Sequence, residues 1–206
     1  MEGFRIHAGH FAERYGLVVV IALGESIVSV GVGAAGLALD RGVIVAAILA
    51  LVLAAGLWWA YFDKVMHYAE RDLAAATGAA RAQIARDGYS SLNLPIVAGI
   101  VFLALGLKKS LDHVGDPLDT IPAVALCGGV ALFLVAHNSV RFRLIRSVSV
   151  PRMVVALVAC LLVPVATSVA ALTVLAILTA LVAMLAVFET VTAAATRREV
   201  RSHHAV

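Results

Sequence analysis

One long apolar stretch constrains this chain more than any other feature. Residues 15–37, YGLVVVIALGESIVSVGVGAAGL, carry a single acidic side chain, Glu25, near their middle. About twenty apolar residues in a helix cross the hydrocarbon core of a bilayer. The stretch therefore predicts a transmembrane helix with a carboxyl group close to the membrane midplane. Because a charged group is costly at that depth, Glu25 is the first candidate functional residue.

The rest of the chain has the same character. Of its 206 residues, 62% are hydrophobic and only 14% are charged, whereas a soluble domain has about 45–50% apolar and about 25% charged residues. The apolar residues form long uninterrupted runs, which indicate helices rather than the short alternating strands of a membrane β-barrel. We predict an all-α fold: a polytopic integral membrane helical bundle, a single transmembrane domain over residues 1–206 in contact with the lipid bilayer.

Six transmembrane helices are predicted, at roughly 15–37, 43–62, 92–107, 121–137, 153–167 and 173–189. The last two are separated because one helix of that combined length would extend on the order of 54 Å, well beyond a hydrocarbon core of about 30 Å. Between and around the spans we expect a polar lead, a partly helical connecting segment and a basic tail, at 1–14, 63–91 and 190–206.

The basic residues predict the orientation of the chain. With six spans both termini lie on one side, and that side carries thirteen of the sixteen Lys and Arg residues; the other side has Arg41, Lys108 and Lys109. Cytoplasmic loops carry the excess of basic residues in membrane proteins. Both termini, the lead, the connecting segment and the tail are therefore predicted to be cytoplasmic.

Neither charge nor cysteine content indicates a further ligand. The net charge of +3 is accounted for by the loops between spans, so no nucleic-acid partner is expected. Cys127 and Cys160 both lie inside apolar runs, without the spacing of a disulfide framework or a metal site. We expect no metal and no cofactor.

A polar cluster precedes the first span at the expected cytoplasmic entrance: His7, His10, Glu13 and Arg14. On a helix, His7, His10 and Arg14 would share one face. Histidine is a common metal ligand and titrates near neutrality, which makes a metal or proton site one interpretation. Two histidines and one carboxylate are few for a metal site, so a polar interfacial cap is the favoured interpretation.

Two further pairs are secondary polar sites. Asp63 and His67 stand four residues apart after the second span, as a proton-relay or metal pair would, although an ordinary helix-end contact is favoured. His137 and Asn138 close the fourth span. Together with Arg141 they are candidate partners of Glu25, although they lie near an interface and Glu25 lies deeper.

The first half of the chain resembles a known family. HFAERYGLVVVIALGESIVSVGVG is similar to the signature of the bacterial low temperature requirement A family, in which a lead like His10, Glu13, Arg14, Tyr15, Gly16 and Leu17 enters a helix with Leu23, Gly24, Glu25 and Ser26. LWWAYFD (57–63) and NLPIVAGIVFLALGL (93–107) resemble two further landmarks of the family. The last two helices resemble it only in hydropathy.

The resemblance implies a multi-pass protein of the bacterial inner (plasma) membrane linked to growth in the cold. It brings no established biochemical activity. Family members are nearly twice this long, with a similar number of helices ahead of the signature, so the chain resembles their C-terminal half. Two kinds of protein partner therefore stay open: a second copy of the chain, or the missing N-terminal half.

Two functional classes stay open as well. In the first, Glu25 binds a proton or cation that is coupled to transport of a small solute or ion, with hydroxyls supplied by Ser26 and by Ser29, one turn further on. In the second, Glu25 fixes helix packing in a non-transporting membrane scaffold or cold-stress protein, because polar groups also hold membrane helices together. An enzyme is not expected, since no Gly-x-Ser-x-Gly, His-Glu-x-x-His or paired intramembrane aspartates occur.

Overall fold

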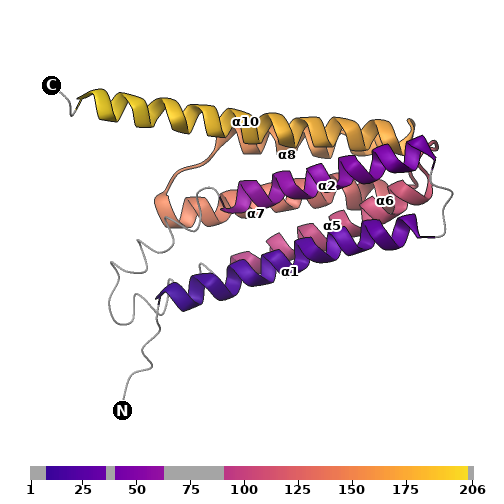
Figure 1. The fold of residues 1–206 in the computed structure, drawn as a ribbon, viewed down its shortest axis with the longest axis horizontal. Coiled ribbons are helices and arrows are strands. Elements are labelled where there is room, and N and C mark those ends of the chain that lie inside the picture. Colours follow the sequence, from indigo (N-terminus) through magenta and orange to yellow (C-terminus); the bar gives the residue numbers. More distant parts are fainter. Residues whose placement is uncertain (1–7, 36–39, 63–90, 204–206) are drawn as a thin grey trace, which may run out of the picture.

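The structure is a computed structural model that describes residues 8–35, 40–62 and 91–203. Over these ranges the chain is almost entirely helical, which confirms the predicted all-α class. The helices, with the bounds that follow, lie side by side in one bundle (Figure 1): α1 Ala8–Ala34, α2 Arg41–Phe62, α5 Ser91–Asp112, α6 Thr120–Ala123, η2 Val124–Gly128, α7 Gly129–Ile145, α8 Val150–Leu161, α9 Val163–Ala166 and α10 Ala171–His203. The π-helical turn η2 joins α6 and α7 into one continuous helix.

Five helices within the described ranges are long and apolar enough to cross a membrane. Each corresponds to one of the predicted spans: Gly16–Ala34, Arg41–Phe62, Asn93–Asp112, Thr120–Arg143 and Ala171–Thr192. Large apolar side chains remain exposed on the outer faces of these helices, as contact with lipid requires. The chain is a multi-pass membrane protein.

The sixth predicted span, 153–167, is formed by two shorter pieces. Helix α8 has only 12 residues, which extend about 18 Å, and α9 follows it after Leu162. Pro164 explains the interruption, because proline has no N–H to bond the carbonyl of residue 160 and its ring crowds that carbonyl. The chain then reverses through Thr167 and Ser168, whose hydroxyls donate to the Pro164 carbonyl.

The helices share one apolar core. Helix α5 packs between α1 and α7, α2 packs on α10, and α8 packs on α7 and α10. The contact between α5 and the continuous helix of η2 and α7 is close enough to require glycine on both sides. A Cβ on Gly106 would lie 2.5 Å from Leu126 Cα, and a Cβ on Gly129 would lie 2.6 Å from Leu103 N. Small residues of this kind allow membrane helices to approach backbone to backbone.

The two ends of the bundle differ. Helix α1 begins and α10 ends at the same end (Figure 1), as an even number of crossings requires. At the opposite end, the 113–119 loop is tied to the turn between α9 and α10, because Leu118 N–H donates to Ala166 O and Ala171 N–H donates to Asp116 O. Which end faces the cytoplasm stays a prediction. Helix α1 already starts inside the predicted lead, and α10 continues through most of the predicted tail.

Candidate functional site

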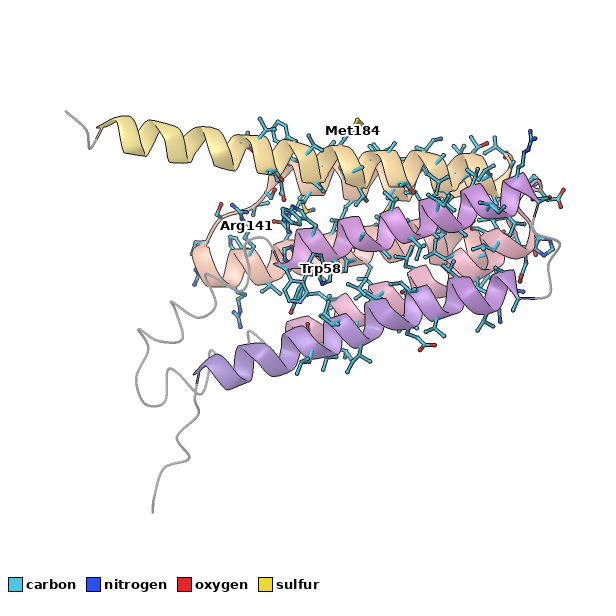
Figure 2. All side chains as sticks on the ribbon, viewed as in Figure 1. Trp58, Arg141 and Met184 are labelled. Atoms are coloured by element: carbon cyan, nitrogen blue, oxygen red, sulfur yellow. The ribbon has the colours of Figure 1, made fainter. Side chains whose placement is uncertain are left out.

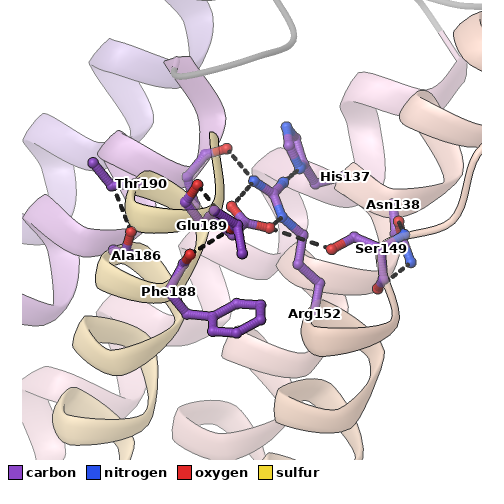
Figure 3. A network of polar contacts seen from close by, with 10 residues as sticks. His137, Asn138, Ser149, Arg152, Ala186, Phe188, Glu189 and Thr190 are labelled. Atoms are coloured by element: carbon purple, nitrogen blue, oxygen red, sulfur yellow. Dashed lines mark hydrogen bonds and ion pairs between the residues drawn. The ribbon is translucent and has the colours of Figure 1, made fainter. Parts of the chain in front are cut away.

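Three helices bring polar side chains together at the end of the bundle where α1 begins. Helix α7 contributes His137 and Asn138, the N-terminus of α8 contributes Ser149 and Arg152, and α10 contributes Glu189 (Figure 3). All five side chains are buried. We refer to these five residues as the Arg152 cluster.

A bidentate ion pair forms the centre of the Arg152 cluster. Arg152 Nη2 lies 2.6 Å from Glu189 Oε2, and Arg152 Nε donates to Glu189 Oε1 at 2.8 Å. The two side chains are only 1% and 7% exposed. Removing two ions from water costs several kcal/mol each, and parallel N–H···O bonds of this geometry are among the strongest that can offset that cost. Neither charge can lose its partner without a large penalty.

The remaining donors of Arg152 extend the ion pair to other helices. Nη2 also donates to the main-chain carbonyl of Ala60, near the end of α2, at 3.1 Å. Nη1 donates to Nδ1 of His137 on α7. Ser149 Oγ donates to Glu189 Oε1 at 3.3 Å. One guanidinium on α8 therefore links α2, α7 and α10.

Asn138 positions the start of α8. Its side-chain oxygen accepts from the N–H of Ser149 at 2.9 Å, and its amide nitrogen donates to the Ser149 carbonyl at 3.3 Å. Because α8 begins directly after Ser149, this pair of bonds fixes the first turn of α8 against α7. Arg152 lies in that first turn, with Pro151 beside it at a position where proline suits a helix.

The two ring nitrogens of His137 have different surroundings. Tyr61 and Phe133 flank it, with ring centroids at 5.8 and 6.2 Å. Nδ1 accepts from Arg152, so the proton of a neutral ring is assigned to Nε2. Nε2 points away from the Arg152 cluster (Figure 3), is buried, and has no hydrogen-bond partner in the part of the chain that the structure describes.

Glu25 lies elsewhere, midway along α1 and exposed on its outer face. Its neighbours on that face are apolar and also exposed: Ile21, Val28 and Val32 at 70%, 56% and 56%. Among the described residues no hydrogen bond or ion pair to Glu25 is present. The carboxyl group therefore stands on an otherwise apolar outer surface.

Glu25, Ser26 and Ser29, which were predicted to act together, do not all lie on one side of α1. Ser26 is fully buried, and its hydroxyl donates to the carbonyl of Ala22 one turn earlier, at 3.3 Å. Ser29 is partly buried and follows Glu25 by four residues, so it lies on the same side of α1. Only Ser29 is therefore placed to accompany Glu25.

The other predicted polar residues fall into two groups: those whose side chains are not described and those that lie in the Arg152 cluster. His7, Asp63 and His67 lie outside the described residues, and His10, Glu13 and Arg14 lie in a part of α1 whose side chains are not described. Those predictions stay predictions. His137 and Asn138, by contrast, lie beside each other in the Arg152 cluster rather than beside Glu25. Among the described residues no three His, Cys, Asp or Glu side chains are grouped to hold a metal ion.

The sequence interpretation missed Arg152 and Glu189. Arg152 counted only as a loop charge and Glu189 only as the end of the last span. A usable signal was present: each is a lone charge of opposite sign, one just inside the start of α8 and the other near the end of the apolar part of α10. Charged residues inside membrane spans usually pair with one another.

Comparison with known proteins places the chain in a family. The model of the family described as "Bacterial low temperature requirement A protein (LtrA)" matches residues 1–187. An uncharacterized protein of Rhizobium meliloti (strain 1021) is 35% identical over 136 residues, which are 65% of this chain and 32% of that relative. The matched part of the chain thus spans about a third of that curated relative. No solved structure matches the chain.

Proposed function

The chain belongs to the bacterial low temperature requirement A family, and from that premise we propose that it takes part in proton- or cation-coupled transport of a small solute, with Glu25 as the group that binds the proton or cation. The position of Glu25 carries the proposal. It stands near the middle of a span, on the outer face of α1, without a hydrogen bond among the described residues.

Lipid is a poor environment for this carboxyl group. A charged side chain at the centre of a membrane helix costs about 2.5–3.5 kcal/mol on insertion scales, and such residues normally face a bundle interior or a water-filled cavity. The outer face of α1 therefore suits contact with a hydrated pathway or with further helices. The pathway would lie between α1 and those helices.

The alternative, in which Glu25 fixes the packing of this bundle, fits the geometry less well. The inward side of α1 at that level is occupied by Ser26, whose hydroxyl is already bonded to its own helix. Glu25 points to the other side and holds no neighbouring helix within the described residues. A carboxyl group that is not used for packing remains available to bind and release a proton or cation, with Ser29 as a second oxygen ligand.

The length of the relative supports a pathway shared with other helices. The matched part of the chain is about a third of the Rhizobium meliloti protein. In the proposed arrangement the Glu25 face of α1 meets helices of a longer protein or of a second copy, and the pathway is complete only when that face is covered.

Reconstitution into proteoliposomes with a pH-sensitive dye inside tests the proposal. Glu25→Gln should keep expression and the midpoint of thermal unfolding but abolish pH-dependent flux, whereas Glu25→Asp, which retains a carboxyl group, should keep part of it. Ser26→Ala is the matched control from the inward side and should keep full flux. Absence of flux in the wild type, together with loss of assembly in Glu25→Gln, would contradict transport and favour the packing role.

A further inference from the structure

A second polar feature at the cluster end of the bundle lies outside the Arg152–Glu189 ion pair. His137 Nε2 and Arg141 Nε are buried nitrogen atoms without a hydrogen-bond partner in the described part of the chain. The two residues are four apart on α7, so their side chains lie on the same face, one turn apart. We call them the His137–Arg141 donor pair.

Both atoms are donors. Arg152 donates to Nδ1 of His137, which leaves the ring proton on Nε2. The Nε of an arginine always carries a hydrogen. The main-chain carbonyl of Tyr61 lies near the His137 ring, but outside the geometry of a hydrogen bond to Nε2. Within the described residues, two buried N–H groups on one face therefore lack an acceptor, which is rare in proteins.

The local charge is positive. Both carboxylate oxygens of Glu189 accept hydrogen bonds from Arg152. No salt bridge to Arg141 is present among the described residues. An acceptor at the donor pair is thus favoured when it carries negative charge. The C-terminal dipole of α7 opposes an anion, but this effect is weak beside two charge-assisted hydrogen bonds.

The donor pair lies at the level of the membrane interface. The apolar span of α7 ends at Arg143, two residues beyond Arg141. Trp58 and Trp59 of α2 are exposed at the same end of the bundle, and Figure 2 shows Trp58 and Arg141 there. Exposed tryptophans mark the headgroup region. Basic sites between membrane helices at this level bind phosphate headgroups.

We propose that the His137–Arg141 donor pair binds one phosphate group, with His137 Nε2–H and Arg141 Nε–H donating to its oxygens. The phosphate belongs either to an anionic lipid headgroup or to a soluble phosphate. Arg141 is only partly buried, so the site opens toward the headgroup region. The site is independent of transport through Glu25, which lies on another helix.

The test uses the whole 206-residue chain, purified in detergent and freed of lipid. The probes are phosphatidylglycerol, uncharged diacylglycerol with the same acyl chains, and inorganic phosphate. Native mass spectrometry measures retained lipid, and the midpoint of thermal unfolding measures binding. We expect phosphatidylglycerol to be retained and to raise the midpoint, and diacylglycerol to do neither. If inorganic phosphate alone gives the same Arg141-dependent shift, the phosphate site is supported with a soluble ligand.

Variants separate a directed donor from charge alone. Arg141→Lys keeps the charge but lacks the Nε–H, and we expect it to bind phosphatidylglycerol about tenfold more weakly, as the loss of one hydrogen bond to a charged group predicts. Arg141→Gln should bind more weakly still. Arg146→Gln removes a charge from the exposed end of the same helix, where Arg146 lies over the Phe142 ring, and should bind like the wild type.

Three results would overturn the proposal. The first is unchanged binding in Arg141→Lys and Arg141→Gln, which would leave only water at the donor pair. The second is equal stabilisation by diacylglycerol, which would indicate contact with acyl chains alone. The third is equal weakening in Arg146→Gln, which would indicate nonspecific attraction to the basic end. If Arg141→Gln fails to fold, Arg141→Lys alone decides.

Discussion

The two acidic residues Glu189 and Glu25 both lie inside apolar spans, yet their surroundings are opposite. Glu189 is buried, accepts two hydrogen bonds from Arg152 and a third from Ser149, and belongs to a network that joins four helices. Glu25 is exposed on an apolar face and has no such partner among the described residues. The Glu189 carboxylate stabilises the packing of the bundle. The Glu25 carboxyl group forms no such contact among the described residues and is exposed.

The difference teaches that an acid in a membrane span is not by itself evidence of transport. The ion pair with Arg152 is by itself enough to explain why a charged Glu189 lies inside a membrane span. Glu25 has no such ion pair among the described residues. Its exposed position on an apolar face calls for a polar partner outside the described helices. The functional hypothesis therefore rests on the residue that the bundle does not use.

The largest expected effect comes from breaking the ion pair. Arg152→Met leaves Glu189 buried without a cation, and we expect a loss of about 3–5 kcal/mol in stability, measured as a lower thermal unfolding midpoint in detergent. The double variant Arg152→Met with Glu189→Met should recover much of the loss, because no buried charge is then unpaired. A double variant as unstable as the single one would show that the packing of Arg152, rather than its charge, holds the four helices.

A smaller effect compares the interior of the bundle with the outer face of α1. Gly106→Ala places a Cβ 2.5 Å from the main chain of Leu126, which cannot rotate away, and overpacking of this kind costs about 1–3 kcal/mol. Gly31→Ala is the matched control on α1, where nothing lies within 4 Å of the new Cβ. It should be neutral or stabilising in the purified chain, since alanine favours a helix by up to about 1 kcal/mol.

The comparison also shows what the sequence could and could not predict. Length and hydropathy alone predicted the class and five spans, because a helix must satisfy its own backbone in lipid. The prediction of Glu25 near mid-span depended on the same reasoning. The Arg152 cluster depended on the relative rotation and depth of four helices, which hydropathy does not contain. Asn138, Arg152 and Glu189 belong to three different helices. The hydrogen bonds between Asn138 and Ser149 fix the turn before α8 and so place Arg152 close to α7.

The smallest change in stability is expected at Glu25 itself, together with the clearest chemical contrast. Glu25→Gln removes no contact seen among the described residues, so its free energy of unfolding should change by no more than about 0.5 kcal/mol.

A hydrophobic carbodiimide, which reacts with accessible carboxyl groups from the apolar phase, should modify Glu25 and leave Glu189 unmodified, as mass spectrometry of the peptides would show. Arg152→Met should make Glu189 reactive while Glu25 stays reactive, because the pair is what shields Glu189. If Glu25 instead resists the reagent in the purified chain and becomes reactive only when the oligomer is dissociated, the outer face of α1 is already covered by a second copy, and the proposed pathway lies within that interface.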